Sequence, residues 1–391
     1  MRQSDICAII DLNVPSEALE PLTQYRPIGT LPFAGRYRLI DFPLSDIANA
    51  GIRDVGMYMP ASSRSVQDHV RSGSTWNLDT ITGGIFTFPY VATKNYNNPL
   101  NRQRYYDDYL TFLKKSNTRF TVIISARNIE NINLQEVLQF HLEGNAPITT
   151  LYKRQLASGT TPDEDALKIS AAGEVSNIVT AGDLTPDAKT HTLPMAMGVY
   201  MLRTSLLIEM VQNASEQEDF IRLPKILEEA VSVYNANAYE YTGFYANINS
   251  IKRYFDANMA MLEEANYQAL LYSQRHIFTK NKNEVPTFFS DASEVNNSLL
   301  GTGGWIEGKV NESVIFRRSR IAKGAEIDHS VLMQGCKVGE NTKLRYVILD
   351  KGVVVGPNLT LEGTPEEPLV YSKNAIVETD AKTEEGRVEL Q

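Results

Sequence analysis

The sequence predicts two folds in one chain, an α/β domain followed by a parallel β-helix of hexapeptide repeats. From residue 52 to about residue 274, short apolar runs alternate with amphipathic segments, which is typical of an α/β sheet. From Val310 onward, aliphatic residues recur in steps of five, six and six, repeated three times. Steps near six indicate a β-helix, in which each short strand places one aliphatic side chain inside.

The repeat argues against ordinary secondary structure. A helix would show steps of three and four, and a simple strand would show steps of two. Each coil of a β-helix buries its apolar face only against its neighbours, so about three coils are near the minimum for stability. We therefore expect the α/β domain at 1–274, a linker at 275–309, the β-helix at 310–369 and a polar, acidic tail at 370–391. The repeating residues are Val310, Ile315, Ile321, Ile327, Leu332, Val338, Leu344, Leu349, Val355 and Leu361.

Within the α/β domain we expect strands and helices to alternate. The first strand, at 5–12, is short and apolar and should open a buried sheet. Asn133 is the expected N-cap of a helix at 133–142, with Glu136 at the N3 position. Further strands are expected at 55–59, 120–125, 148–152, 167–170, 175–179 and 195–202, helices at 46–51, 63–71, 105–115 and from 203 through Val211, an irregular segment at 83–91 and a loop at 94–101.

Composition narrows the class of partner and the compartment. The chain has 391 residues and a formal net charge of −9, which argues against nucleic acid or an anionic membrane as a main partner. No apolar run approaches the length of a membrane span, and the N-terminus lacks the apolar region of a signal peptide. Cys7 and Cys336 lie in apolar, strand-like contexts and are expected to be reduced and buried. We therefore expect a cytoplasmic protein.

The loop after the first strand carries the clearest functional signal. In a nucleotide-binding α/β unit this loop holds phosphate, because free backbone N–H groups point outward there. Glycines let the backbone approach the phosphates without a Cβ in the way. Residues 13–21, Asn-Val-Pro-Ser-Glu-Ala-Leu-Glu-Pro, contain no Gly, Lys or Arg, and they include two prolines and two acids. The loop is therefore predicted to be unable to hold a triphosphate.

Two segments carry a resemblance to a known family. Residues 21–52, PLTQYRPIGTLPFAGRYRLIDFPLSDIANAGI, resemble the N-terminal signature of ADP-glucose pyrophosphorylases (glucose-1-phosphate adenylyltransferases). Residues 313–332, SVIFRRSRIAKGAEIDHSVL, look like the β-helix of the same family. The resemblance implies a Rossmann-like nucleotidyltransferase domain and a left-handed β-helix. It also places the family's glycine-rich loop on residues 13–19 and its catalytic Arg on Ala18, as in the non-catalytic, GlgD-type subunit.

The resemblance implies that further active-site groups are missing. Nucleotide transfer needs Mg²⁺ to neutralise phosphate charge, and Mg²⁺ needs carboxylate ligands. One family Asp falls on Arg127 and a second on Asn247, and the Lys that holds the sugar phosphate falls near Asp183, in a segment without Lys. The family's Gly-Thr-Ala-Asp-Ala motif falls on 101–105. Together with Ala18, these changes imply no catalytic residue, no metal site and no cofactor on this chain, with Mg²⁺ bound only by a catalytic partner.

Other interpretations of the cleft stay open. The chain is alternatively a weakly active nucleotidyltransferase with rearranged ligands, drawn from Asp11, Asp107 and Asp108. A third hypothesis is a stand-alone sensor that binds a sugar phosphate or nucleotide without turning it over. We also hypothesise that Arg127 occupies the emptied metal position and forms an ion pair there.

A second site is implied by cations that the family uses to bind small phosphorylated effectors. By the resemblance, Arg26, Arg38 and Lys351 stand where effector-binding enzymes carry Arg, whereas Tyr25 and Ile28 replace family Lys residues. Converging cations make an anion site, and Arg is favoured for its fork of donors. Solvated surface charge is the alternative for each residue. Further basic side chains at Arg317, Arg318 and Arg320 extend this site, serve an interface or are solvated.

These inferences predict a regulatory, non-catalytic subunit of ADP-glucose pyrophosphorylase in bacterial glycogen biosynthesis. The family is tetrameric, so the chain is expected to assemble with a catalytic subunit. It would activate that subunit, or alter its response to effectors, through differential contacts at the shared interface. The expected partners are this catalytic subunit and a small phosphorylated effector, with neither nucleic acid nor a membrane among them.

Overall fold

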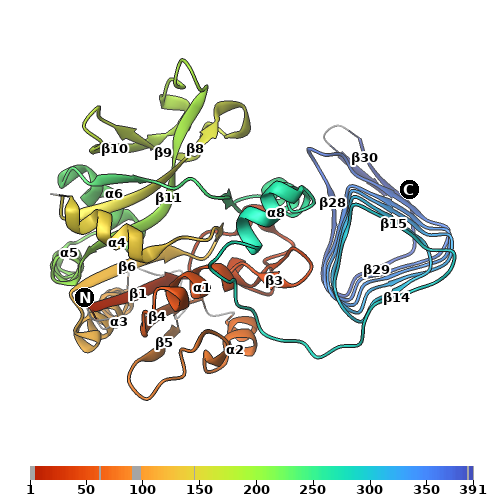
Figure 1. Cartoon of the computed structure of the whole chain (residues 1–391), viewed down its shortest axis with the longest axis horizontal. Helices are drawn as coiled ribbons and strands as arrows, with labels where there is room; N and C mark the ends of the chain where they lie inside the picture. The colour runs from red at the N-terminus through yellow and green to blue at the C-terminus, as the bar shows by residue number, and fades with distance from the viewer. Residues whose placement is uncertain (1–4, 61–62, 90–97, 145, 385–386, 391) are drawn as a thin grey trace. The chain divides into compact units, whose positions relative to one another are not determined.

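The computed structural model of the chain describes residues 5–60, 63–89, 98–144, 146–384 and 387–390 (Figure 1). It divides into two compact units, termed here the sheet unit and the β-helix unit. The division does not follow chain order, because the β-helix unit includes a segment close to the N-terminus. The sheet unit comprises Met1–Val14, Phe42–Tyr245 and Arg275–Phe278, and the β-helix unit comprises Pro15–Asp41, Ala246–Gln274 and Thr279–Gln391.

A nine-stranded mixed sheet organises the sheet unit. Its main path runs β10-β9-β11-β6-β1-β4-β5, and β8 pairs with β11 and with β12. Strands β6, β1, β4 and β5 are parallel, whereas β11 runs antiparallel to β6. All six residues of β1 are buried, as expected for a strand of a parallel sheet that is covered on both faces.

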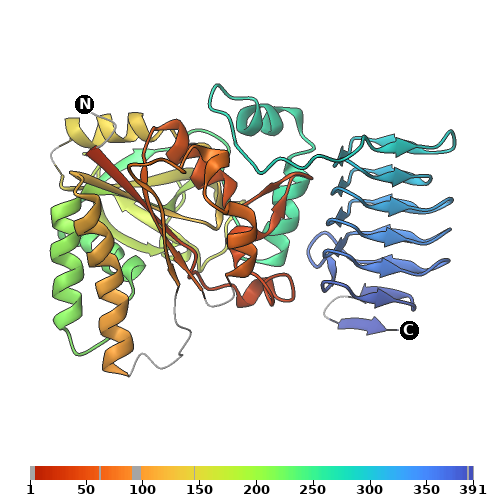
Figure 2. The same cartoon turned by 90° about the horizontal axis from the view of Figure 1, so that it is seen from below.

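Helices cover both faces of this sheet. Figure 2 shows α3 and α5 on one side of the sheet and α4 on the other. A single apolar cluster joins α3, α5 and α6 to the strands, with Tyr106, Phe112, Leu207 and Leu227 among its buried members. Asn133 caps α4 as predicted, because its side chain accepts hydrogen bonds from the backbone N–H groups of the second and third helical residues.

The elements of the sheet unit have the following bounds. The strands are β1 Ile6–Asp11, β4 Asp54–Met59, β5 Gly84–Pro89, β6 Phe120–Ser125, β7 Asn128–Ile129, β8 Ile148–Leu156, β9 Asp165–Ile169, β10 Val175–Thr180, β11 Thr192–Arg203 and β12 Asn237–Glu240. The helices are α1 Asp41–Asn49, α2 Arg64–Val70, α3 Pro99–Ser116, α4 Leu134–Glu143, α5 Thr204–Glu216 and α6 Leu223–Val233, with 3₁₀ turns η4 Ser74–Trp76, η5 Ala157–Gly159 and η6 Ala181–Asp183.

The β-helix unit is dominated by a left-handed β-helix of triangular cross-section (Figure 1). Its three sides are termed here the first, second and third sheets, which begin with β14, β15 and β16 respectively. Every predicted repeat residue from Val310 to Leu361 is buried in one core cluster, so the prediction of inward-facing aliphatics is confirmed. Parallel pairing joins Val310 to Ile327 and Ile327 to Leu344, which sets the coil length at 17 residues.

The elements of the β-helix unit have the following bounds. The short elements before the β-helix are η2 Glu17–Leu19, η3 Ile28–Thr30, β2 Pro32–Phe33, β3 Tyr37–Arg38, β13 Ala246–Asn247, α7 Ile251–Ala260 and α8 Glu264–Leu271. The first sheet contains β14 Phe288–Phe289, β17 Trp305–Ile306, β20 Arg320–Ile321, β23 Lys337–Val338, β26 Val354–Val355 and β29 Ile376–Val377. The second contains β15 Glu294–Asn296, β18 Lys309–Asn311, β21 Glu326–Asp328, β24 Lys343–Arg345, β27 Thr360–Glu362, β30 Ala381–Glu384 and β31 Arg387–Leu390. The third contains β16 Leu299–Leu300, β19 Val314–Ile315, β22 Val331–Leu332, β25 Val347–Leu349 and β28 Leu369–Tyr371.

The β-helix is longer than the sequence predicts. It begins at β14, inside the expected linker at 275–309, and strands β28 to β31 lie largely in the expected tail at 370–391. The physical reason is that the end coils break the regular step. Val295 pairs with Val310 only 15 residues later, and Leu349 pairs with Tyr371 across a longer coil.

Other differences are local. Residues 84–89 form strand β5, where an irregular segment was expected, because they pair in register with β4. Helix α1 begins five residues earlier than predicted, at Asp41, whose carboxylate accepts a hydrogen bond from the N–H of Arg38. The expected loop at 94–101 falls partly outside the described residues, and α3 already begins at Pro99. No helix in the described part of the chain is both long enough and apolar enough to cross a membrane.

Candidate functional site

The carboxyl ends of the parallel strands are the place where an α/β sheet of this kind binds its ligand. Three neighbouring strands end there in register, with Asp11 of β1 beside Tyr58 of β4, and Tyr58 beside Phe88 of β5. None of these three residues is a glycine that would let a phosphate approach the backbone. The edge therefore carries one acid and two aromatic rings where a phosphate-binding sheet would offer open backbone.

Aromatic side chains stack against this edge. The rings of Tyr58 and Phe88 lie 4.9 Å apart and nearly parallel, and Tyr109 of α3 stacks on Tyr58 with ring centroids 3.8 Å apart. Tyr105 packs edge-on against Tyr109 at 5.1 Å and against Phe220 at the same distance. These contacts form a continuous aromatic stack over the strand ends. We refer to Tyr58, Phe88, Tyr105, Tyr109 and Phe220 as the aromatic stack.

Hydrogen bonds hold the tyrosines of α3 in place. The hydroxyl of Tyr105 accepts a hydrogen bond from the N–H of Leu223 at 2.8 Å. The hydroxyl of Tyr106 donates to the carbonyl of Ile221 at 2.8 Å and accepts from its N–H. By the resemblance, Tyr105 stands where the family has an alanine, so a small residue that would leave room for a ligand is replaced by a large, anchored one.

Asp11 lies beneath the aromatic stack. It is buried, and one of its carboxylate oxygens accepts a hydrogen bond from the N–H of Asn13 at 2.8 Å. Burial raises the pKa of Asp11, and the opposing effect of the hydrogen bond and of nearby Arg222 is smaller. Arg222 also donates to the carbonyl of Asn13 at 3.4 Å. Asp11 is thus engaged by its own loop.

Arg127 follows β6 at the position where the resemblance places a metal-binding Asp. Within the described residues, no carboxylate lies close enough to Arg127 to form an ion pair. The hypothesis of an ion pair at this position is therefore wrong. Burial raises the pKa of Tyr200 and of Tyr245, and the charge of Arg127 lowers both by a smaller amount. Both tyrosines are buried.

The remaining degenerate positions also lack the expected chemistry. Asp183 is exposed in η6, and its carboxylate accepts a hydrogen bond from the hydroxyl of Thr180 at 2.7 Å. Ala18 is exposed in the 3₁₀ turn η2, and Asn247 lies in β13. Among these positions only Asp183 carries a carboxylate, and that position is where the family uses a cation.

The side chains at the sheet edge do not fit a Mg²⁺ site. Asp107 is exposed and accepts a hydrogen bond from Gln103, and burial raises the pKa of half-buried Asp108. In the part of the chain that the structure describes, no three His, Cys, Asp or Glu side chains are grouped so that they would hold a metal ion. Asp11, Asp107 and Asp108 therefore do not form the rearranged ligand set considered above.

The predicted effector residues do come together, in the β-helix unit. The pKa of Lys351 is lowered first by burial and then by nearby cations, of which Lys373 has the largest effect and Arg38 the next. Arg317 and Arg26 contribute as well. These five basic side chains, Arg26, Arg38, Arg317, Lys351 and Lys373, are termed here the cation cluster. Mutual repulsion of this kind favours binding of an anion.

Two acids balance part of the cation cluster. Arg26 forms a buried ion pair with Asp350, and its Nε also donates to the carbonyl of Leu22 at 2.8 Å. Arg317 pairs with the nearly buried Glu284. Glu284 also binds Arg318, at 2.8 Å, so two of the three arginines in the expected 317–320 run serve one carboxylate. Lys373 is exposed, and Lys351, although partly desolvated, is exposed enough to remain accessible to an anion from solvent.

Comparison with known proteins agrees with this architecture. Residues 16–264 match the nucleotidyl transferase family, and residues 286–367 match the GlmU-like C-terminal hexapeptide family. The glycogen biosynthesis protein GlgD of Bacillus subtilis (strain 168) is 31% identical over 376 residues, which cover 96% of this chain and 98% of that protein. The chain belongs to the nucleotidyl transferase family, among the GlgD proteins.

Two further relatives place this GlgD-family chain near an enzyme. The GlgD protein of Geobacillus stearothermophilus is 31% identical over 369 residues, 94% of this chain and 96% of that protein. The glucose-1-phosphate adenylyltransferase of the same organism is 28% identical over 321 residues, 79% of each chain. The resemblance to the ADP-glucose pyrophosphorylase family is therefore confirmed, as is the fold that it implied.

One feature of this GlgD-family chain was missed from the sequence: a pair of buried acids. Glu130 follows β7, and among the described residues only the Asn128 side chain lies near enough to lower its pKa, without a hydrogen bond of normal geometry. Burial, together with nearby Asp46, raises the pKa of Glu130 well above its usual range, and burial raises that of Asp46. Asp46 accepts one hydrogen bond, from the N–H of Ile132 at 3.0 Å. The available sequence signal was an acid between the apolar residues Ile129 and Ile132.

Replacing Glu130 with Gln is expected to stabilise the protein at neutral and alkaline pH. A carboxyl group with a raised folded pKa binds its proton more tightly in the folded state. Stability is therefore lost as the pH rises from the ordinary range of a Glu carboxyl through the raised folded value. Removing this titration should therefore raise the free energy of unfolding at pH 8, by about 1.4 kcal/mol for each unit by which folding raises the pKa.

The measurement is urea unfolding between pH 4 and pH 9. The Glu130→Gln variant should match the parent near pH 4 and exceed it increasingly as the pH rises. Glu143→Gln, which removes an exposed carboxylate at the end of α4, is the control and should follow the parent throughout. Parallel curves for parent and Glu130→Gln would contradict the prediction.

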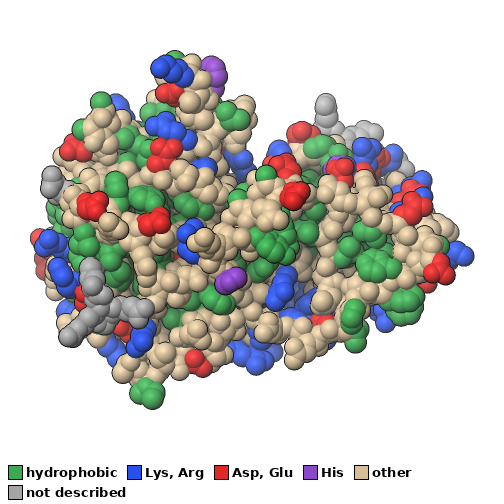
Figure 3. Space-filling model, in the orientation of Figure 1, with side chains coloured by type: hydrophobic (Ala, Val, Ile, Leu, Met, Phe, Trp, Pro, Cys, Tyr) green, Lys and Arg blue, Asp and Glu red, His purple; other side chains and the backbone are tan. Residues whose placement is uncertain are grey.

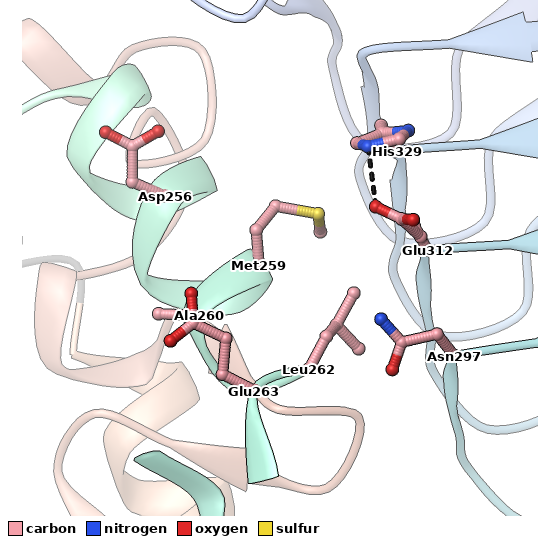
Figure 4. A pocket seen from close by; sticks show the side chains of 8 residues that line it. All are labelled: Asp256, Met259, Ala260, Leu262, Glu263, Asn297, Glu312 and His329. Atoms are coloured by element: carbon pink, nitrogen blue, oxygen red, sulfur yellow. Dashed lines mark ion pairs between the residues drawn. The ribbon is translucent and has the colours of Figure 1, made fainter. Parts of the chain in front are cut away.

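A pocket of about 320 Å³ lies within the β-helix unit (Figure 4). Met259 and Leu262 face Asn297, Glu312 and His329, which occupy equivalent corners of three successive coils. Its polar groups largely satisfy one another, because Glu312 pairs with His329 at 2.7 Å. At its margin, Asp256 pairs with Lys252 at 2.8 Å. We therefore assign this pocket no ligand.

The surface charges are mixed. On the face shown in Figure 3, acidic and basic side chains are interspersed, and no patch of one sign covers it. Binding of nucleic acid relies on extended basic surface, because phosphate contacts provide most of the affinity. This face offers no surface of that kind.

Proposed function

We propose that this chain is a regulatory, non-catalytic subunit of ADP-glucose pyrophosphorylase that acts in glycogen biosynthesis in the cytoplasm. It assembles with a catalytic subunit, as a heterotetramer, and raises that subunit's activity or changes its response to effectors. The catalytic subunit binds Mg²⁺, ATP and glucose 1-phosphate, whereas this chain performs no transfer. The names of its relatives, a glycogen biosynthesis protein and a glucose-1-phosphate adenylyltransferase, support this assignment.

The observation that carries the proposal is the aromatic stack at the strand ends. A nucleotide bound there would have to displace Tyr109 from Tyr58, and these rings are nearly fully buried. The cation at Arg127 adds a second obstacle, since it stands where Mg²⁺ would need a carboxylate. The loss of chemistry and the retention of the fold together favour a structural and regulatory role.

Regulation would act through differential contacts with the partner. A subunit changes its partner's activity only if it binds the partner's active and inactive states with different affinity. The cation cluster supports regulation of this kind by a small phosphorylated effector. Such an effector is an anion, and Lys351 and Lys373 would bind it. The chain would then transmit effector binding to the partner.

The test is an assay of ADP-glucose formation from ATP and glucose 1-phosphate. We expect no turnover by the pure chain and a higher rate, or an altered glucose 1-phosphate dependence, when the chain is mixed with a catalytic subunit. Changing Arg127→Asp alone should not restore turnover, because the glycine-rich loop is still absent. Mg²⁺-dependent turnover by the chain alone would overturn the proposal in favour of an active nucleotidyltransferase.

We expect inorganic phosphate to raise the melting temperature of the chain through the cation cluster. Ligand at 100 times its Kd stabilises a folded protein by about 2.7 kcal/mol. The effect should weaken as the pH rises, because Lys351 has a lowered pKa and loses its charge earlier than an ordinary lysine. Thermal unfolding with phosphate and with a sugar bisphosphate measures this shift.

Matched variants test whether the cation cluster binds the phosphate. Lys351→Ala and Arg38→Ala should each lose most of the phosphate-dependent shift. Lys343→Ala removes an exposed lysine from the second sheet of the β-helix and should keep the shift. An equal shift in all four proteins would place the anion elsewhere. Stabilisation by ATP or ADP-glucose that survives Lys351→Ala would instead favour a sensor that uses the old cleft.

A further inference from the structure

The three outer faces of the β-helix differ sharply in chemistry. On the second sheet, acids and bases alternate from coil to coil and pair with one another. Lys309 binds Glu294 at 3.1 Å, and Lys343 binds Glu326 at 3.5 Å. A parallel column beside them is also paired, through Asn311 with Asp328, Arg345 with Asp328 and Glu362, and Lys382 with Glu362. This face is a self-neutralised, solvated surface.

The third sheet differs from the second because its outward side chains are apolar and buried. Its outward column consists of Val314, Val331 and Ile348, which pair in register from coil to coil. All three side chains are fully buried and lie outside the core cluster of the β-helix. This face is therefore already covered within the folded chain.

The first sheet presents a third kind of surface. Parallel pairing aligns one outward residue from each of its six strands, and we term this set the outer column: Phe288, Trp305, Arg320, Lys337, Val354 and Ile376. All six are exposed. With a strand spacing of about 4.8 Å, the outer column is roughly 24 Å long. Figure 2 shows the strands of this sheet stacked coil upon coil.

The outer column contains large apolar groups at both ends and two cations in the middle. Phe288 and Trp305 stack with ring centroids 4.2 Å apart, although each ring remains about half exposed. Within the described residues, neither Arg320 nor Lys337 forms an ion pair with a carboxylate. Exposed aromatic and aliphatic groups around a positive centre are the composition of a protein interface rather than of a solvated face.

We propose that the outer column is a docking surface for a different protein chain, which presents carboxylates to Arg320 and Lys337 and apolar side chains to the two ends. The choice of that chain rests on the proposed function, which makes it the catalytic subunit. Trp305 is the expected anchor, since tryptophan and arginine contribute most of the binding energy at protein interfaces.

The charge pattern argues against a second copy of this chain as the occupant. A two-fold axis through the middle of the outer column would place Arg320 against Lys337 of the second copy, and like charges held together cost several kcal/mol. The charged side chains of the second sheet are already paired with one another. A partner with acidic groups therefore complements this surface better than the chain complements itself.

The experiment measures the Kd of the full-length chain for the purified catalytic subunit by analytical ultracentrifugation. The Arg320→Ala and Lys337→Ala double variant removes two outward cations from the first sheet. We expect its Kd to rise at least about tenfold and to depend less on salt than that of the parent. Trp305→Ala should weaken binding by a similar factor without changing the salt dependence.

A matched control comes from the second sheet. The Lys309→Ala and Lys343→Ala double variant changes the net charge by the same amount on the same β-helix. It should bind within about twofold of the parent, because surface ion pairs of this kind contribute little. Melting temperatures of all variants verify that the β-helix stays folded.

Each outcome decides the question. Weakening confined to the outer-column variants supports the docking surface. If the parent and the outer-column variants bind the catalytic subunit equally well, the outer column is not the docking surface, and the proposed function is unaffected. Equal weakening by the control variant shows a general charge effect and overturns the surface too. A parent that does not bind the catalytic subunit at all removes the proposed function, and the inference with it. Loss of self-association instead would make the occupant a second copy.

Discussion

Replacing Tyr109 with alanine is expected to lower the free energy of unfolding of the sheet unit by about 3–5 kcal/mol. Tyr109 is 1% exposed and stacks directly on Tyr58, so its removal leaves a cavity at the centre of the aromatic stack. The cost combines the lost transfer free energy of the ring with the cavity that the rigid neighbours cannot fill. Such a loss is a large part of the stability of an ordinary domain.

The two tryptophans of the chain allow the sheet unit to be followed alone. Trp76 is buried in the sheet unit, whereas Trp305 lies in the β-helix unit. In a Trp305→Phe background, urea unfolding followed by fluorescence reports on the sheet unit. Ile81→Ala removes an exposed side chain of the sheet unit and should change its stability by less than about 0.5 kcal/mol. A Tyr109→Ala variant as stable as this control would show that the aromatic stack is loosely packed and open to ligand.

Replacing Asp350 with alanine is expected to destabilise the β-helix unit by about 3–5 kcal/mol, because it leaves Arg26 buried without its counter-charge. The Arg26 side chain is only 12% exposed, and that of Asp350 is 1% exposed. The carboxylate also accepts a hydrogen bond from the N–H of Lys351, which would lose its partner. Circular dichroism during thermal unfolding measures the loss.

Phosphate distinguishes this prediction from a simple packing defect. An anion bound to the cation cluster would replace the missing charge beside Arg26, so phosphate should restore part of the stability of Asp350→Ala. The control is Glu294→Ala, which breaks the exposed pair of Lys309 and Glu294 in the same unit and should cost less than about 1 kcal/mol. If Asp350→Ala costs no more than this control, or if phosphate restores nothing, Arg26 is not part of an anion site.

The resemblance found the degenerate positions one by one but not what fills their place. Ala18, Arg127, Asp183 and Asn247 are visible as substitutions in a linear comparison. The aromatic stack is not, because Tyr58, Phe88 and Tyr109 come from two strands and a helix that only the sheet register brings together. In the same way, the described residues show no ion pair at Arg127, and its charge acts instead on Tyr200 and Tyr245, which come from distant segments.

The other features that the sequence did not predict arise where side chains from distant segments meet. The cations of the effector site were named from the sequence, but Asp350 and Glu284, which pair with Arg26 and Arg317, were not. The buried acids Glu130 and Asp46 lie in polar-looking segments whose burial depends on the packing of the whole unit. Neither pairing nor desolvation can be derived from local pattern, because both depend on residues far apart in the chain.

By itself, the sequence determined the periodic features of this protein. The recurrence of aliphatic residues at Val310, Ile315 and Ile321 specifies a β-helix, since each coil repeats the same local geometry and pairs with its immediate neighbours. The absence of glycine from residues 13–21 likewise predicts, from backbone sterics alone, that this loop does not bind phosphate. Only the tertiary structure decided which side chains meet: the rings that close the strand ends, the acids that balance the cation cluster and the outer column of the first sheet. Those contacts depend on three-dimensional register and burial, which no single stretch of sequence contains.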